Sequence, residues 1–375
     1  MNPARLLRVS VFAPIVSGVL TLSSLAPSLF AADPPVTHTI TVISTTVPSN
    51  GDENPYGIFE VPETVGNLVK GNLLISNFNN SSNFQGTGTT LVQISPGGSF
   101  SLFAQIDAST LPGPCPGGVG LTTALAVLRT GWVIVGSLPT TDGTSATAQA
   151  GCLLILDAWG HVQETIYGNL INGPWDMTVK DRSNSRGGGS ASLFVTNVLN
   201  GTVAAGGSVV NGGTVLRVDL TLSSSAPPFV EAETVIGSGF PERTDPGALV
   251  IGPTGVGLSK DGFSLYVADS LSNRIASIAM PLTRTNSDRT GKTITKNGGL
   301  NDPLGLAVTG SGDILTANGD DGFMIQTTPD GQQVAMNLLD SSGDPPGSGA
   351  LFGLVSIGNS VYYVDDATNK LNLFH

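Results

Sequence analysis

Carboxylate and amide side chains recur at the ends of short apolar runs in this sequence. Runs such as "SLYVAD" and "DILTAN" stop on an Asp or an Asn and then turn. Five side chains share this position: Asn77, Asn197, Asp269, Asn318 and Asp365. Asp and Asn accept hydrogen bonds from nearby backbone N–H groups, so turns are the first explanation of the pattern. The alternative is that some of these oxygens bind a polar ligand or Ca²⁺, which prefers carboxylate and amide oxygens.

Two pairs of adjacent acids extend this pattern. Asp320 and Asp321 follow Asn318 in "GDDGF", and Asp365 and Asp366 open "DDATN". If the two turns are neighbours in space, the four carboxylates form a candidate Ca²⁺ site. We expect turn acids exposed to water, with the calcium site as the alternative and with no other cofactor.

Other catalytic signatures are missing from the chain. The three histidines, His38, His161 and His375, are not spaced to share a metal or to activate a nucleophile, which argues against a Ser/His/Asp triad and a His-based metal centre. The glycine-rich stretches contain no Gly-Lys-Ser and open no predicted helix, so they are interpreted as loops between strands rather than phosphate-binding loops.

The two cysteines and the N-terminus indicate an exported protein. Residues 1–31 have Arg5 and Arg8, then an apolar stretch, then small residues, which is the order of a secretory signal peptide. A secreted or periplasmic chain with an even cysteine count permits a Cys115–Cys152 disulfide, with two buried thiols as the alternative. An uncleaved anchor helix is the alternative for the N-terminus, and no later stretch is apolar and long enough to span a bilayer.

The charge balance excludes one class of partner. The formal net charge is −12, and the 16 Lys and Arg residues are scattered along the chain. Nucleic acids and anionic membranes need a clustered basic surface, so neither is an expected partner.

The elements that must position the acids form a repeat. Each run that ends on Asp or Asn follows another short run that begins in a Gly- or Pro-rich turn, as in "NPYGIFEV" and "DPLGLAV". Two more runs come after it in every unit except the last. Four-stranded units with a period of roughly 40–50 residues predict a β-propeller. Six units are expected near 54–107, 119–168, 173–237, 253–296, 303–340 and 350–375, as a single domain over 32–375.

The last unit is one strand short. It ends at "NKLNLFH", its third strand, which would leave an exposed edge. Residues 37–45 have the period-2 alternation and the β-branched residues of a strand. We therefore expect this N-terminal strand to complete the sixth blade and close the ring.

One unit also carries a family resemblance. "PTGVGLSKDGFSLYVADSLSNRIASI" resembles the NHL repeat through Pro253, Gly255, Leu265, Asp269 and Arg274, among other positions. The end of the pattern returns in "VYYVDDATNKL". The resemblance implies a six-bladed, four-stranded, all-β propeller. It says little about activity, because such propellers serve both as binding proteins and as enzymes.

The predicted fold gives the acids a common place. The second strands of all blades end on one face, so the five Asp and Asn residues should ring one mouth of the channel, with Phe78, Phe84 and Trp175 nearby. We expect these aromatic residues either to contact a ligand there or to pack between blades.

The expected function is a binding or scaffold module, a monomer that holds an unidentified small molecule, glycan or protein at this mouth. The alternative is a hydrolase with its site in the channel. Calcium-dependent lactonase propellers are similar in fold, and Glu60 is the one Glu in roughly the right place to match their metal ligands.

Overall fold

The computed structural model describes residues 38–184 and 186–375. The predicted signal peptide lies outside these residues. Within residues 38–375, no helix has the length and hydropathy that crossing a membrane requires.

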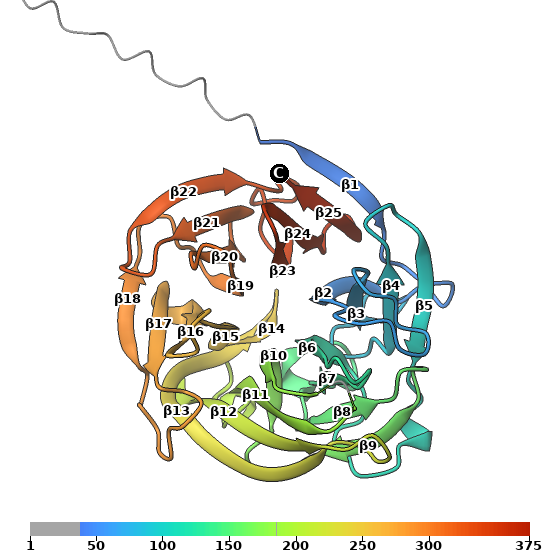
Figure 1. Cartoon of the computed structure of the whole chain (residues 1–375). Coiled ribbons are helices and arrows are strands. Elements are labelled where there is room, and N and C mark those ends of the chain that lie inside the picture. The colour runs from blue at the N-terminus through green and yellow to red at the C-terminus, as the bar shows by residue number, and fades with distance from the viewer. Residues whose placement is uncertain (1–37, 185) are drawn as a thin grey trace, which may run out of the picture. The chain divides into compact units, whose positions relative to one another are not determined.

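Six antiparallel sheets stand around a central channel, each with its first strand innermost (Figure 1). The inner strands are β2 (Glu53–Glu60), β6 (Leu121–Val127), β10 (Gly173–Asp181), β15 (Pro253–Leu258), β19 (Pro303–Val308) and β23 (Leu351–Ile357). The second strands are β3 (Leu73–Asn79), β7 (Val133–Ser137), β11 (Gly189–Val198), β16 (Ser264–Asp269), β20 (Ile314–Asn318) and β24 (Ser360–Asp365). The third strands are β4 (Thr90–Ile94), β8 (Cys152–Leu156), β12 (Val210–Leu222), β17 (Arg274–Ala279), β21 (Phe323–Thr327) and β25 (Lys370–Phe374).

The outer strands complete the blades. They are β5 (Phe100–Gln105), β9 (Val162–Ile166), β13 (Phe229–Asp245), β18 (Lys292–Lys296), β22 (Gln333–Leu338) and β1 (Ile40–Thr45). Strand β6 is buried at every position and is apolar or small throughout, whereas burial in β22 alternates, with Val334, Met336 and Leu338 on its exposed side. The six-bladed propeller with four-stranded blades is therefore confirmed.

Two further predictions are also confirmed: the N-terminal strand that closes the ring, and the disulfide. Strand β1 pairs antiparallel with β25, from Ile40 opposite Phe374 to Thr45 opposite Lys370. Cys115 and Cys152 form a disulfide with a Cα–Cα distance of 5.2 Å. The bond ties the loop that enters the second blade to the third strand of that blade.

Apolar clusters lie between neighbouring blades around the whole ring. Hydroxyl groups on second strands or in the turns that follow them also join blades. Ser76 Oγ donates to Thr122 O, Thr196 Oγ1 to Thr254 O, and Ser270 Oγ to Pro303 O, each over 2.7 Å. These hydroxyls satisfy inner-strand carbonyls that would otherwise be buried without a donor.

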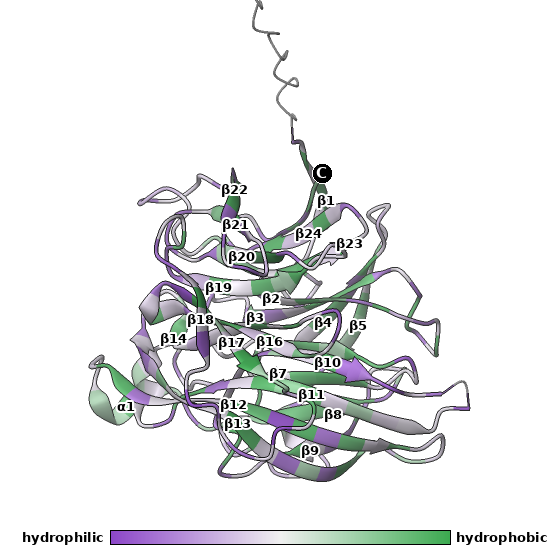
Figure 2. Cartoon of the chain, turned by 60° about the vertical axis from the view of Figure 1, so that its left-hand side comes forward, coloured by the Kyte–Doolittle hydropathy of each residue, from purple (hydrophilic) through white to green (hydrophobic). Residues whose placement is uncertain are grey.

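The third blade departs from the predicted pattern. Its outer strand β13 has 17 residues, and a turn then leads into β14 (Leu249–Ile251), which pairs back onto residues 243–245. Strand β14 reaches the centre of the ring (Figure 1). The short helix α1 (Thr202–Ala205) lies beside this blade (Figure 2). The sequence analysis ended this blade near residue 237 and did not predict the hairpin.

Candidate functional site

The two ends of the channel are built differently. We call the end where the inner strands begin the upper end, and the end where they finish the lower end. Each of the five predicted ring residues pairs with a residue near the start of an inner strand, for example Pro55 with Asn77 and Pro303 with Asn318. The structure therefore places the ring at the upper end, but all five side chains are buried.

The ring residues make different contacts inside the protein. Asp365 caps a turn, since its Oδ1 accepts from Thr368 N at 3.0 Å. Asp269 pairs with Arg274 Nε at 2.9 Å, and burial raises its pKa despite that guanidinium. Asn77 donates to Thr46 O and Thr90 Oγ1, Asn318 donates to Gly299 O and Asp321 Oδ1, and the Asn197 amide has no protein partner.

An aromatic plug closes the channel beneath this ring. The Tyr56 ring stacks on Phe352 with centroids 3.8 Å apart and on Phe78 at 4.4 Å. Trp175 is 3% exposed, and its Nε1 donates to Val250 O of β14 at 3.0 Å. Residues 248–251 join the same buried cluster. Phe78 and Trp175 are thus packing residues of the plug, whereas Phe84 is exposed on the surface.

The predicted acid pairs lie near this plug. Asp321 Oδ1 accepts from Phe323 N at 3.2 Å as a turn cap. Burial raises the pKa of Asp320 and raises that of Asp366 strongly, with Asp365 and Glu53 adding repulsion at Asp366. Among the described residues, no three His, Cys, Asp or Glu side chains are arranged to hold a metal ion. Glu60 ends β2, so it lies at the lower end, away from these acids.

Glycine lets the inner strands approach one another closely. At equivalent positions of four blades, a Cβ would come within 2.9 Å of a backbone oxygen in the next blade. The four positions are Gly57, Gly255, Gly305 and Gly353. Only glycine fits where the neighbouring backbone is this close.

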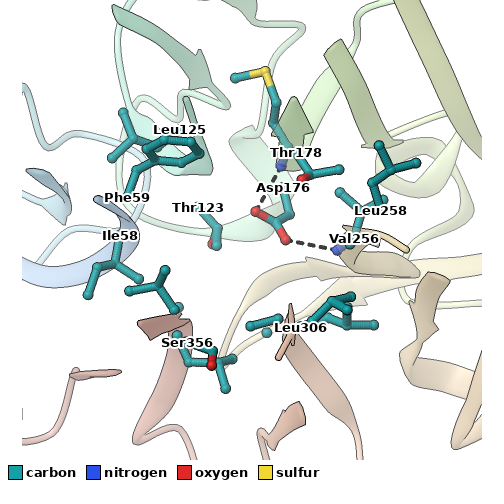
Figure 3. A pocket seen from close by; sticks show the side chains of 18 residues that line it. Ile58, Phe59, Thr123, Leu125, Asp176, Thr178, Val256, Leu258, Leu306 and Ser356 are labelled. Carbon is teal, nitrogen blue, oxygen red and sulfur yellow. Dashed lines mark hydrogen bonds between the residues drawn. The ribbon is translucent and has the colours of Figure 1, made fainter. Parts of the chain in front are cut away.

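The two remaining blades carry side chains at this position. Asp176 in β10 is one of them. In β6, which has one residue more between its paired positions than β10 has, Ala124 takes this place before Leu125, and Thr123 lies next to it. Thr123 and Asp176 both line a cavity of about 200 Å³ around the lower halves of the inner strands (Figure 3). The glycine ring is therefore interrupted in two neighbouring blades, and only Asp176 puts a polar group in the place of glycine.

Asp176 bridges the third and fourth blades. Its Oδ1 accepts from Met177 N at 2.8 Å and its Oδ2 from Val256 N at 2.9 Å, as the dashed lines of Figure 3 show. Burial raises its pKa to about 7, and the two N–H donors oppose that shift. Asp176 is the one titratable group among the described residues that line the cavity, so the cavity holds a single group able to exchange a proton near neutral pH.

Thr123 presents a hydroxyl without a protein partner. Its Oγ1 is buried and makes no hydrogen bond to the protein, although it lies beside the cavity. Ser356 supplies a second hydroxyl to the same cavity, and aliphatic side chains from all six inner strands supply most of the remaining wall (Figure 3). A small, mostly apolar molecule with one or two polar atoms fits this lining.

Neither Thr123 nor Asp176 was a predicted site residue. The signal for Asp176 is present in the sequence, because five inner strands align as "YGI", "WDM", "TGV", "LGL" and "FGL". The middle column is glycine in four segments and Asp in one. Reading the repeat column by column, rather than by its turn residues, would have found Asp176. It would not have found Thr123, because β6 has an extra residue at this point of the strand.

Solved propellers resemble this chain in fold. A gluconolactonase from Xanthomonas campestris has a TM-score of 0.53 and 13% identity, covering 90% of this chain and 89% of its own. A calcium-binding protein, regucalcin, from Agrobacterium tumefaciens has 0.52 and 14%, covering 89% and 94%. A luciferin-regenerating enzyme has 0.51 and 10%, covering 90% and 95%. No protein-family model and no curated protein matches the chain significantly. At these identities the likeness shows a β-propeller fold, and the NHL repeat stays a prediction.

Proposed function

We propose that this protein is a hydrolase that cleaves a small, mostly apolar ester or lactone in the lower channel cavity. One observation carries the proposal: Asp176 is the single titratable group of an otherwise apolar and hydroxyl-lined cavity, with a pKa of about 7. A general base works best when its pKa lies near the working pH. Similarity in fold to a gluconolactonase and to a luciferin-regenerating enzyme supports the choice by analogy.

Asp176 acts as the base and Thr123 as the hydrogen-bond donor in this mechanism. The Asp176 carboxylate takes a proton from a water molecule as the water oxygen bonds to the carbonyl carbon. The carbonyl electron pair moves onto its oxygen, where the unpartnered Thr123 hydroxyl stabilises the charge. The C–O bond of the ester or lactone then breaks, and Asp176 returns its proton to the leaving alkoxide.

This mechanism contains no step through a metal. A calcium ion takes six to eight oxygen ligands, whereas the described residues around the cavity supply one carboxylate and a few hydroxyls. That donor set does not fit Ca²⁺. The disulfide supports an exported enzyme, because such bonds persist mainly in oxidising compartments.

The test is hydrolysis of γ- and δ-lactones and methyl esters of four to eight carbons, followed in a pH-stat. We expect kcat/KM to rise with pH through an apparent pKa near 7. Asp176→Asn should lower kcat at least about 100-fold, and Thr123→Val about 10- to 100-fold. The amide NH₂ group that Asp176→Asn introduces would face a backbone N–H donor, which can disturb the fold. Asp176→Gly therefore serves as a second variant, because glycine is the residue at this position in four other blades.

Tyr56→Phe is the matched control, since it removes an unpartnered buried hydroxyl at the upper end. It should leave turnover unchanged. Tight binding of these compounds without turnover would mean that the protein is a small-molecule binding module and not a hydrolase. Full activity in both Asp176 variants would remove Asp176 from the mechanism.

A further inference from the structure

A second candidate site lies away from the channel, on the turns that follow the lower ends of blades one to three. It is a groove of about 470 Å³, which we call the tryptophan groove. Trp159 and Trp132 form one side of it, and Ser223, Ser224 and Ser225 form another. It shares no lining residue with the channel cavity.

Trp159 is held in the open by a rigid turn. Its side chain is 58% exposed. The Asp157 carboxylate fixes the turn, since Oδ1 accepts from Trp159 N at 3.0 Å and from His161 N at 2.9 Å. Asn67 N also donates to Ala158 O at 2.8 Å, which anchors the turn to the first blade. The turn needs no tryptophan for its own structure, because all of these bonds use backbone atoms or Asp157.

The rest of the groove combines polar groups with Val65, Ala226 and Pro227, and it lacks cations. Among its described lining residues, none is Lys, Arg or His. The one carboxylate, Asp157, is already bonded to the turn and to Gln163 Nε2 at 2.9 Å. Thr130 Oγ1 is buried without a partner, and the carboxamide oxygen of Gln163 is not used by that bond. The groove therefore offers an aromatic face and neutral donors and acceptors, which favours a neutral ligand over an anionic one.

From this arrangement we infer that the tryptophan groove binds a neutral carbohydrate. The C–H groups of a pyranose ring carry partial positive charge and pack on the negative face of an indole, here that of Trp159. The sugar hydroxyls, which both donate and accept, pair with Gln163, Thr130 and the serine turn. A proline-rich peptide would also stack on tryptophan, but it would leave most of these hydroxyl partners unused.

The test is binding of neutral oligosaccharides of two to six units, built from glucose, mannose, galactose or N-acetylglucosamine. Binding to the intact propeller is measured by isothermal titration calorimetry. At least one series should bind. Trp159→Ala should weaken that binding at least 10-fold, and Gln163→Ala about 3- to 10-fold. Phe263→Ala is the matched control, since Phe263 is 60% exposed on a turn of the fourth blade. It should bind as the wild type does.

Several results would overturn the inference. They are no binding to any of these oligosaccharides, binding that survives Trp159→Ala, and stronger binding of a hexaproline peptide than of any sugar. Unchanged melting of the Trp159→Ala protein would show that it folds. Sugar binding should also persist in Asp176→Asn, so this inference and the proposed channel activity can fail separately.

Discussion

The upper and lower ends of the propeller channel use the same six strands for opposite purposes. At the upper end, Tyr56, Phe352 and Trp175 fill the space, and β14 packs against them. At the lower end, glycines keep the strands close, and Asp176 alone among the equivalent positions puts a polar group into a cavity, which the Thr123 hydroxyl also lines. Polar residues at the mouth of a propeller therefore do not by themselves mark the open end, because an apolar plug beneath them can close it.

The acids at the two ends also differ in number and in role. The upper end gathers several carboxylates, and Asp302 has a pKa raised to about 7 by burial and by repulsion from Asp320 and Asp245. The pKa of Asp320 is in turn raised by burial and by repulsion from Asp245 and Asp321, so these acids act on one another. The lower cavity has one carboxylate, raised mainly by burial. A single buried acid beside a cavity can exchange its proton with a ligand, whereas at the upper end Asp321 and Asp365 cap turns and the neighbouring acids repel one another.

The largest expected effect is on the plug. Phe352→Ala removes a ring that is 1% exposed and stacked on Tyr56, so it should destabilise the protein by about 3–5 kcal/mol in urea unfolding. Ser356→Ala, at the lower end of the same strand, is the matched control and should cost about 0.5 kcal/mol or less. Similar costs for the two variants would mean that the upper end is not the better-packed one.

The next effect is the pH dependence of stability. Asp176 has a pKa of about 7 in the folded protein, against about 4 in an unfolded chain. Between these values the folded state holds the proton and the unfolded state does not, so stability falls as pH rises through this window. Three units at about 1.4 kcal/mol each set an upper bound of about 4 kcal/mol.

The wild type should therefore be more stable to urea at pH 5 than at pH 8. Asp176→Gly should flatten this dependence by the contribution of Asp176, and Asp302→Asn by the contribution of Asp302, one of several raised acids at the upper end. A wild-type protein that gains stability from pH 5 to pH 8 would contradict the burial of both acids.

A smaller effect concerns the predicted calcium ligands. Asp365 accepts a hydrogen bond from Thr368 N, and its pKa is raised to about 6 by burial and by Asp340. Asp365→Ala should cost about 1 kcal/mol, because the lost hydrogen bond is partly offset by relief of a buried acid. Chelator should leave the melting temperature unchanged. A calcium-dependent rise in melting that Asp365→Ala abolishes would restore the upper end as a metal site.

The sequence predicted the fold because every blade repeats it. The β-branched runs, the turns after Asp and Asn, and the unpaired final strand all follow from local chemistry, and the structure confirms the ring and its closure. The plug was missed because it depends on long-range packing. Nothing local to Trp175 shows that β14 will lie over it. The prediction was based on the turn residues and did not compare the inner strands position by position. Asp176 was therefore missed, although four other blades have glycine at the same position.

The smallest effect separates the two ends most cleanly. Tyr56 Oη at the upper end and Thr123 Oγ1 at the lower end are both buried without a protein partner. A buried hydroxyl without a hydrogen bond costs free energy, so Tyr56→Phe and Thr123→Val should each stabilise the protein slightly, by about 0.5–1 kcal/mol. If the lower end is the functional one, only Thr123→Val should weaken lactone turnover, so that its gain in stability accompanies a loss of activity. Equal stabilisation with unchanged turnover in both variants would make Thr123 a packing residue, and would leave Asp176 as the sole polar group of the cavity with a role in the chemistry.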